Sequence, residues 1–111
     1  MIVLQIYFLI NDDKTKDFES LYDHHYVSAL RKQKGYLGSK LLRIYPHEKG
    51  ALFNAMQTDF NYQMELYFDT EENRLTWAST EIHAEVWGMA ERLFEKAGAR
   101  GYDIVTDDDL T

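Results

Sequence analysis

The stretch that decides the fold is Ile2–Ile10, which has the sequence IVLQIYFLI. It is rich in β-branched and aromatic residues, it is too short for a stable isolated helix, and the turn-forming residues Asn11–Asp13 follow it. The stretch therefore predicts a β-strand. Its even positions are all apolar, and its odd positions are apolar except for the amide of Gln5 and the phenol of Tyr7. This composition indicates that both faces of the strand are covered.

Helical and strand patterns follow this first strand along the chain. Apolar residues at three- and four-residue spacing predict a helix, a glycine after such a stripe predicts its end, and alternating apolar residues predict a strand. The predicted elements are a helix over 14–34, strands over 36–45 and 60–68, a short helix from 70 toward 77, a helix that restarts at Ser79 and runs to Ala97, and a strand over 100–106.

The first helix carries several aromatic residues and two adjacent histidines. Its periodicity places His25 on the side that faces the sheet, whereas the direction of His24 differs by about 100°. The residues of the predicted buried stripe are Phe18, Leu21, Tyr22, His25, Tyr26, Ala29 and Leu30.

The element order β-α-β-β-α-β is that of the ferredoxin-like split βαβ unit. It predicts an α+β fold in which an antiparallel sheet carries both helices on one face. The other face presents apolar residues of the first strand, whose burial drives association at about 25 cal/mol per Å². Two such sheets closing face to face form a homodimer, a dimeric α+β barrel. Three polar residues, Gln5, Gln63 and Glu65, then need hydrogen-bond partners near that interface.

The chain has 111 residues, enough for one domain, and a net charge of −7. We expect a single domain over 1–106 and an acidic, solvated tail over 107–111. The negative charge opposes binding to nucleic-acid phosphates, and the absence of cysteine excludes a disulfide scaffold and a cysteine nucleophile. The apolar stretches are too short to span a bilayer. We therefore expect a cytoplasmic protein that binds neither membranes nor nucleic acids.

The connection over 47–59 is longer than most hairpin loops and contains Leu52, Phe53 and Met56. Apolar side chains in a long loop must be buried somewhere. Packing on the same domain, packing on a partner subunit, and closure over a pocket as a lid are all compatible with this pattern.

Four segments carry a resemblance to known proteins: FESLYDHHYVSAL (18–30), KGYLGSKLL (34–42), YQMELYF (62–68) and WASTEIHAEVW (77–87). They resemble the dimeric α+β barrel superfamily, and within it the antibiotic biosynthesis monooxygenase-like and EthD-like families. The resemblance extends over nearly the whole chain. It implies the fold more than the chemistry, because the superfamily includes cofactor-independent oxygenases, haem-degrading enzymes, isomerases, dye peroxidases and proteins without known activity.

The haem-degrading branch of this superfamily uses an Asn on the first strand, together with a Trp and a His in the second helical region. Trp77 matches that Trp, but position 87 is Trp rather than His, and no Asn precedes Asn11. Two of the three groups are therefore missing. The dye-peroxidase branch needs a proximal haem ligand and a longer chain. We accordingly expect no bound cofactor.

For a cofactor-independent monooxygenase, the resemblance implies a pocket between sheet and helices, where a small aromatic or polyketide-like substrate loses a proton and its carbanion meets dioxygen. An imidazole with a pKa of about 6.5 can accept or return that proton, so the catalytic candidates are His83 and His25. His83 should touch Trp87, four residues later on the same helix face. Aromatic side chains stack a flat ligand. The ligand-binding candidates are Tyr22, Tyr26, Tyr62, Met64, Trp77 and Trp87.

Each of these residues also has a purely structural explanation, since aromatic stripes fill cores and a helix histidine can simply make one hydrogen bond. The alternative to an enzyme is a non-catalytic homodimer of the same fold that binds a small hydrophobic ligand or a protein. The four histidines share no metal-ligand spacing, and Ser79 has no nucleophile elbow around it. We expect neither a metal site nor a hydrolase triad.

Overall fold

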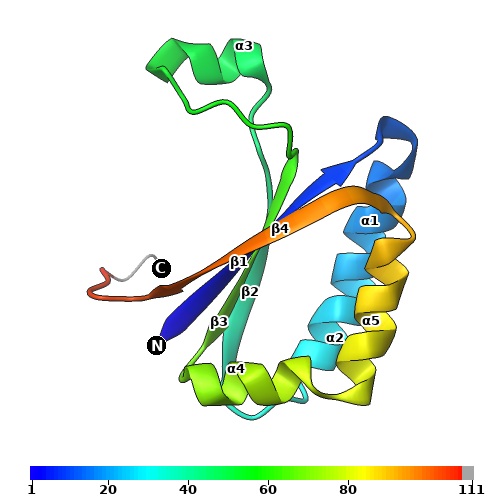
Figure 1. The fold of residues 1–111 in the computed structure, drawn as a ribbon, viewed down its shortest axis with the longest axis vertical. Coiled ribbons are helices and arrows are strands. Elements are labelled where there is room, and N and C mark those ends of the chain that lie inside the picture. Colours follow the sequence, from blue (N-terminus) through cyan, green and yellow to red (C-terminus); the bar gives the residue numbers. More distant parts are fainter. Residues whose placement is uncertain (109–111) are drawn as a thin grey trace.

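Four antiparallel strands form one sheet in this computed structural model, which describes residues 1–108. The strand order across the sheet is β2-β3-β1-β4, and α1, α2 and α5 lie together on one face of it (Figure 1). This is the predicted α+β, ferredoxin-like arrangement. The main elements are β1 (Ile2–Ile10), α1 (Thr15–Leu21), a π-helical turn (Tyr22–Tyr26), α2 (Val27–Leu30), β2 (Tyr36–Arg43), α3 (His47–Gly50), β3 (Tyr62–Phe68), α4 (Glu71–Ala78), α5 (Glu81–Glu91) and β4 (Phe94–Asp103).

The core lies between the helices and the even-numbered residues of β1. Ile6, Phe8 and Ile10 of this strand are at most 6% exposed. The buried residues of β3 alternate in the same way, and Met64 lies directly opposite Ile6 in the ladder. The clean alternation of β3 in the sequence therefore predicted its buried face correctly, although the strand begins at Tyr62 rather than at Phe60.

The other face of the sheet, which α1, α2 and α5 leave uncovered, carries a hydrogen-bonded polar ladder. Glu65 accepts hydrogen bonds from Gln5 Nε2 at 3.1 Å, from Gln63 Nε2 at 2.9 Å and from the Tyr67 hydroxyl at 2.8 Å. Tyr7 donates to Gln5 Oε1 at 2.6 Å. The three polar residues that were predicted to need partners on this face thus satisfy one another within the subunit.

The last strand begins earlier than predicted. Instead of a helix to Ala97 and a strand over 100–106, α5 ends at Glu91 and β4 spans Phe94–Asp103. Phe94 pairs with Ile10 and Ala97 with Phe8, and the ladder register shifts between these two pairs. A bulge of this kind brings residues three apart onto one face of a strand. The helical spacing of Phe94 and Ala97 was therefore misleading.

Gly35 lies in the turn before β2 and has a conformation that other residues avoid. The helix ends at Leu30 rather than at Lys34, and Gly35 follows with a φ of 81°. Its carbonyl accepts a hydrogen bond from the Asp69 backbone N–H at 2.9 Å. A Cβ atom here would lie 2.2 Å from Asp69 Oδ1, so the Asp69 side chain would have to move, and the positive φ is the feature that requires glycine.

The predicted break between the two later helices is confirmed, but the residue that caps the second one is Thr80 rather than Ser79. Thr80 Oγ1 accepts a hydrogen bond from the His83 backbone N–H at 3.1 Å. Thr70 caps α4 in the same way through the Asn73 backbone N–H at 3.1 Å. These caps fix the first turn of each helix. Among residues 1–108, no helix is long and apolar enough to cross a membrane.

Residues 46–58 form a protruding unit that we call the arm. It contains α3 and a 3-10 turn over Ala51–Phe53, and it stands clear of the α1, α2 and α5 layer (Figure 1). The Gly50 N–H donates to the Pro46 carbonyl, and the Ala55 N–H donates to the Gly50 carbonyl, both at 3.0 Å. The arm is therefore an ordered unit rather than an extended loop.

Beyond β4, residues 104–108 have no regular secondary structure. The predicted acidic tail over 107–111 begins in this stretch, and its residues 109–111 lie outside the described part of the chain.

Candidate functional site

The π-helical turn over Tyr22–Tyr26 determines which side chains of the first helix reach the core. The buried positions step from Leu21 to Tyr26, which is 1% exposed, whereas His25 is exposed. The prediction that His25 faces the sheet is therefore wrong, because a wider turn breaks the 3.6-residue period on which it rested. Single π turns inside α-helices occur frequently at functional sites.

Four of the predicted site residues come together between the helices and the sheet: Tyr26, Trp77, His83 and Trp87. We call them the aromatic cluster. The ring centroids of Tyr26 and Trp77 are 6.0 Å apart, edge to face, and those of Trp77 and His83 are 4.9 Å apart with perpendicular planes. His83 stacks on Trp87 with an interplanar angle of 5° and a centroid distance of 6.3 Å. The predicted contact of His83 with Trp87 is confirmed.

The Tyr26 hydroxyl is the one buried side-chain polar atom without a hydrogen-bond partner among residues 1–108. Burial raises the pKa of Tyr26, so the phenol stays protonated and can both donate and accept. A buried hydroxyl without a partner costs about 1–3 kcal/mol. A polar ligand atom placed next to it would gain a hydrogen bond that the protein itself does not make.

His83 has the protonation state that a proton acceptor needs. Burial lowers the pKa of His83 below its ordinary 6.5, and the nearby positive charge of Arg74 lowers it further. The imidazole is therefore neutral at pH 7, with one ring nitrogen able to accept a proton. Its place at the start of α5 is fixed by the Thr80 cap.

A cavity of about 350 Å³ lies between α4 and the neighbouring ends of β1 and β4, and Leu4, Arg74 and Tyr102 are among the residues that line it. The Arg74 side chain is only 17% exposed, and its guanidinium contacts Glu71 at 2.6 and 2.8 Å. Because the same guanidinium lowers the pKa of His83, the cavity and the aromatic cluster are electrostatic neighbours.

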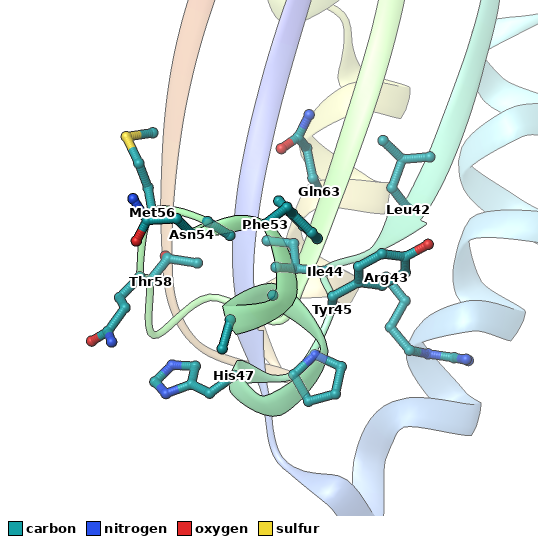
Figure 2. Close-up of a pocket in the computed structure, with 15 residues that line it drawn as sticks. Leu42, Arg43, Ile44, Tyr45, His47, Phe53, Asn54, Met56, Thr58 and Gln63 are labelled. Carbon is teal, nitrogen blue, oxygen red and sulfur yellow. The ribbon is translucent and has the colours of Figure 1, made fainter.

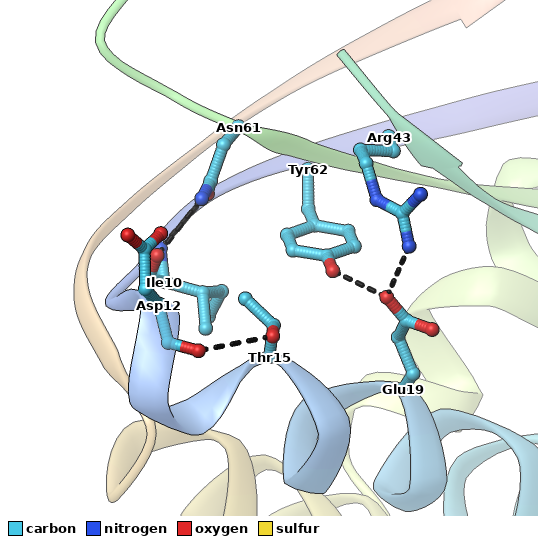
Figure 3. A network of polar contacts seen from close by, with 7 residues as sticks. All are labelled: Ile10, Asp12, Thr15, Glu19, Arg43, Asn61 and Tyr62. Carbon is cyan, nitrogen blue, oxygen red and sulfur yellow. Dashed lines mark hydrogen bonds and ion pairs between the residues drawn. The ribbon is translucent and has the colours of Figure 1, made fainter.

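Tyr22 and Tyr62 line a different opening, a groove of about 350 Å³ between α1 and the strands β2 and β3. Glu19 Oε2 accepts a hydrogen bond from the Tyr62 hydroxyl and contacts Arg43 Nη2 at 2.7 Å (Figure 3). The hydrogen bond from Tyr62 contributes most to lowering the pKa of Glu19, and the hydrogen bond from Arg43 lowers it further. Tyr22 shares a hydrogen bond of 2.6 Å with Ser39 Oγ. Every tyrosine hydroxyl at this groove is therefore already paired.

The space between the helices and the sheet is densely filled. Phe8 and Phe68 are 0% exposed, and Trp77 is 2% exposed. Met64, a predicted ligand contact, is 1% exposed and belongs to this packed core. A ligand that enters here must displace side chains, and the half-buried edge formed by His83 and Trp87 is the place where this requires the least rearrangement.

A third cavity, of about 570 Å³, lies under the arm (Figure 2). Tyr45, Phe53 and Met56 line it from the arm and the end of β2, whereas Leu42 and Gln63 line it from the uncovered face of the sheet. None of the predicted site residues takes part in it.

Sequence reasoning missed Arg74 and Glu19. Arg74 lies three residues before Trp77 on one helix, and this spacing, which puts both on one side of α4, was the available signal. Glu19 has no such signal, because only the fold brings it to Tyr62 and Arg43. Within residues 1–108, no group of three His, Asp or Glu side chains is placed to hold a metal ion.

No protein-family model matches the chain, and no curated protein matches it in sequence. Solved structures do match. A variant of SnoaB, a cofactor-independent oxygenase from Streptomyces nogalater, superposes with a TM-score of 0.74 at 11% identity, covering 96% of this chain and 94% of that one. At3g17210 from Arabidopsis thaliana superposes with a TM-score of 0.76 at 11% identity, covering 97% of this chain and 99% of that one. A variant of MhuD with two manganese protoporphyrin IX groups per active site superposes with a TM-score of 0.76 at 18% identity, covering 98% of this chain and 99% of that one.

These similarities show that the chain has the antibiotic biosynthesis monooxygenase fold, as the sequence resemblance implied. At such low identities they show the fold alone. The neighbours also differ in what their active sites hold, so the chemistry of this chain must be argued from its own residues.

Proposed function

We propose that this protein is a cofactor-independent monooxygenase that acts on a small aromatic or polyketide-like substrate between the sheet and the helices, at the aromatic cluster. The observation that carries the proposal is the Tyr26 hydroxyl, which is buried and lacks a protein partner, on a ring that contacts Trp77. A flat substrate with a polar substituent fits such a place, since it can stack on the indoles and complete that hydrogen bond.

In the proposed reaction, a substrate methylene group between aromatic rings gives a proton to the neutral imidazole of His83. The negative charge left on the substrate is favoured by the guanidinium of Arg74, the positive charge that acts on His83, although the Glu71 carboxylate offsets part of it. The carbanion then forms a C–O bond with dioxygen, which is reduced to a peroxide anion, and the His83 imidazolium returns its proton to give the hydroperoxide. Loss of water from the hydroperoxide leaves a carbonyl, so that CH₂ and O₂ become C=O and H₂O.

The test uses anthrone as substrate and an oxygen electrode. We expect oxygen uptake with the wild-type protein and at least a tenfold lower kcat for His83→Gln, with binding of anthrone retained in calorimetry. His24→Gln is the matched control, because His24 is exposed on the π turn and should leave kcat unchanged. His25→Gln should also leave kcat unchanged, because His25 is exposed as well. Equal oxygen uptake by wild type and His83→Gln removes His83 from the reaction.

The non-catalytic alternative is favoured by the dense packing around Trp77, which a rapid exchange of substrate and product must overcome. In that case the same site binds a small hydrophobic ligand without turnover. Saturable binding of anthrone and of other flat ligands, with no oxygen uptake above the uncatalysed rate, would establish the alternative over the oxygenase.

We also propose a homodimer through the uncovered face of the sheet. Leu9 lies on this face of β1, and Gln5, Gln63 and Glu65 are already hydrogen-bonded to one another, so that covering the face leaves these three with partners. Lys40 and Arg100, which pair with Glu65 and Gln5 across the ladder, need partners from the second subunit. Sedimentation velocity over a range of concentrations tests this assembly. A dimer that Leu42→Glu dissociates is the expected result, because Leu42 is 39% exposed on the same face.

A further inference from the structure

Three large apolar side chains of the arm point into solvent in the single chain. Leu52 is 86% exposed, Phe53 63% and Met56 94%. Contacts with Tyr45, the residue just before the arm, hold the arm in place: Lys49 Nζ lies 3.8 Å from the centroid of the Tyr45 ring, and the Tyr45 and Phe53 rings meet edge to face at 6.4 Å. A folded segment that presents apolar side chains outward is typical of an interaction surface.

The arm is continuous with the uncovered face of the sheet. The cavity under the arm is lined by Phe53 and Met56 on one side and by Leu42 and Gln63 of that face on the other (Figure 2). Whatever covers the sheet face therefore reaches the edge of this cavity. The arm and the face are therefore continuous, with a hollow between the apolar side chains of the arm and the more polar sheet face.

The chain exposes more surface than a compact monomer of its mass, and the protruding arm contributes to this excess. The chain exposes 7625 Å². A compact monomer of its mass exposes about 6,400 Å². The surplus of about 1,200 Å² exceeds the roughly 800 Å² that each partner contributes to an interface of standard size.

Charge distinguishes between possible occupants. The chain carries a net charge of −7, but residues 46–58 contain one acidic and one basic side chain, so the arm is neutral. Two like-charged copies approach each other with the least repulsion through a neutral segment. An anionic lipid surface is disfavoured, because the arm offers it no excess positive charge.

From these observations we infer that the arm clasps a second copy of this chain and inserts Phe53 and Met56 against that copy, which closes the open cavity of about 570 Å³ beneath the arm. The inference extends the homodimer proposed above and depends on it. The cavity is incomplete in the single chain and becomes a closed apolar chamber when the second copy lies across it. By symmetry, the dimer contains two such arms and two such chambers.

The test compares association of the wild-type protein, the arm variant Phe53→Gln/Met56→Gln, and the control Leu75→Gln. Leu75 is 54% exposed on α4, outside both the arm and the sheet face. We expect the arm variant to raise the dimer Kd by about a hundredfold, because each substitution occurs twice in a symmetric dimer. The control should leave Kd unchanged.

Each other outcome overturns the inference in a recognisable way. Equal Kd values for all three proteins would mean that the sheet face alone makes the dimer. A monomeric wild type at every concentration would refute the dimer and the arm contact together. Weaker anthrone binding by the arm variant, with association unchanged, would make the arm a lid.

A spin label provides a second measurement in case the arm variant fails to fold. The chain has no cysteine, so Met56→Cys gives a single labelling site. We expect the label to lose mobility as the protein concentration rises through the dimer Kd, while a label at Leu75→Cys stays mobile. A label on the arm whose mobility does not depend on concentration overturns the inference.

Discussion

Replacing Tyr26 by Phe should make the ligand-free protein more stable, which is unusual for a change in a buried core. Tyr26 is 1% exposed and its hydroxyl has no partner among the described residues. The substitution keeps the ring and its edge-to-face contact with Trp77 and removes only the oxygen. Removing a buried hydroxyl without a partner raises the free energy of unfolding by about 1–3 kcal/mol. The small void left by one oxygen lowers it by a few tenths of this amount. We expect a net gain of about 1 kcal/mol.

Tyr22→Phe is the matched control, one turn earlier on the same helix. The Tyr22 hydroxyl shares a hydrogen bond of 2.6 Å with Ser39 Oγ. Its removal should lower the free energy of unfolding by about 1 kcal/mol. The two substitutions are chemically identical, so the opposite signs isolate the effect of the missing partner.

The assay is urea unfolding followed by far-UV circular dichroism, at one fixed protomer concentration because a dimer makes stability concentration-dependent. An increase of about 1 kcal/mol corresponds to a rise in Tm of about 4 °C for a domain of this size. If Tyr26→Phe destabilises the protein as much as Tyr22→Phe does, the hydroxyl has a partner in solution. The hydroxyl would then not be free to bind a ligand.

Three further predictions concern stability. Gly35→Ala should lower the free energy of unfolding by about 2–3 kcal/mol, because Gly35 has a φ of 81° and a Cβ atom there would lie 2.2 Å from Asp69 Oδ1. Gly88→Ala on α5 should raise the free energy of unfolding by about 1 kcal/mol, because a Cβ atom there meets nothing within 4 Å. Thermal unfolding of both variants checks this pair. The pKa of His83 is lower in the folded protein than in the unfolded chain, so the unfolded chain takes up a proton first and stability falls as the pH drops below about 6.5. His83→Gln should reduce the change of the unfolding free energy between pH 7 and pH 5, and an unchanged pH dependence would show that this burial effect is absent. The hydrogen bonds from Tyr62 and Arg43 lower the pKa of Glu19 in the folded protein, so Glu19 stabilises the fold above about pH 4.5 and this stabilisation is lost as the pH falls through the folded-state pKa. Glu19→Gln should remove this small part of the acid dependence of the unfolding free energy. An unfolding free energy with the same pH dependence in the variant and in the wild type contradicts this prediction.

The strands were predictable where side-chain alternation alone sets the burial. β1 has the predicted bounds, and the alternation of β3 gave its buried face correctly. The start of β4 was not predictable in this way, because a bulge places Phe94 and Ala97 on one face of the strand at a spacing that also suits a helix. Hydrogen bonding to Ile10 and Phe8, which no local pattern reveals, decided between the two structures.

The site was predictable to the extent that it depends on ordinary helical geometry. His83 and Trp87 meet as their spacing on α5 predicted, whereas the contact of Trp77 with His83 joins α4 to α5 and appears only in the fold. The buried position of Tyr26 was predicted correctly, but the π turn leaves His25 in solvent, and nothing in a 3.6-residue period anticipates such a turn. The missing partner of the Tyr26 hydroxyl is a property of the whole packed core, so it could appear only in the structure.

Tryptophan fluorescence tests the central claim most directly, because the chain has two tryptophans and both belong to the aromatic cluster. In Trp87→Phe, the emission comes from Trp77 alone, beside the Tyr26 hydroxyl. The account predicts that anthrone changes this emission saturably, with one ligand per chain and at least tenfold weaker binding in a variant that also carries Tyr26→Phe. Calorimetric binding of anthrone that leaves the Trp77 emission unchanged would contradict it.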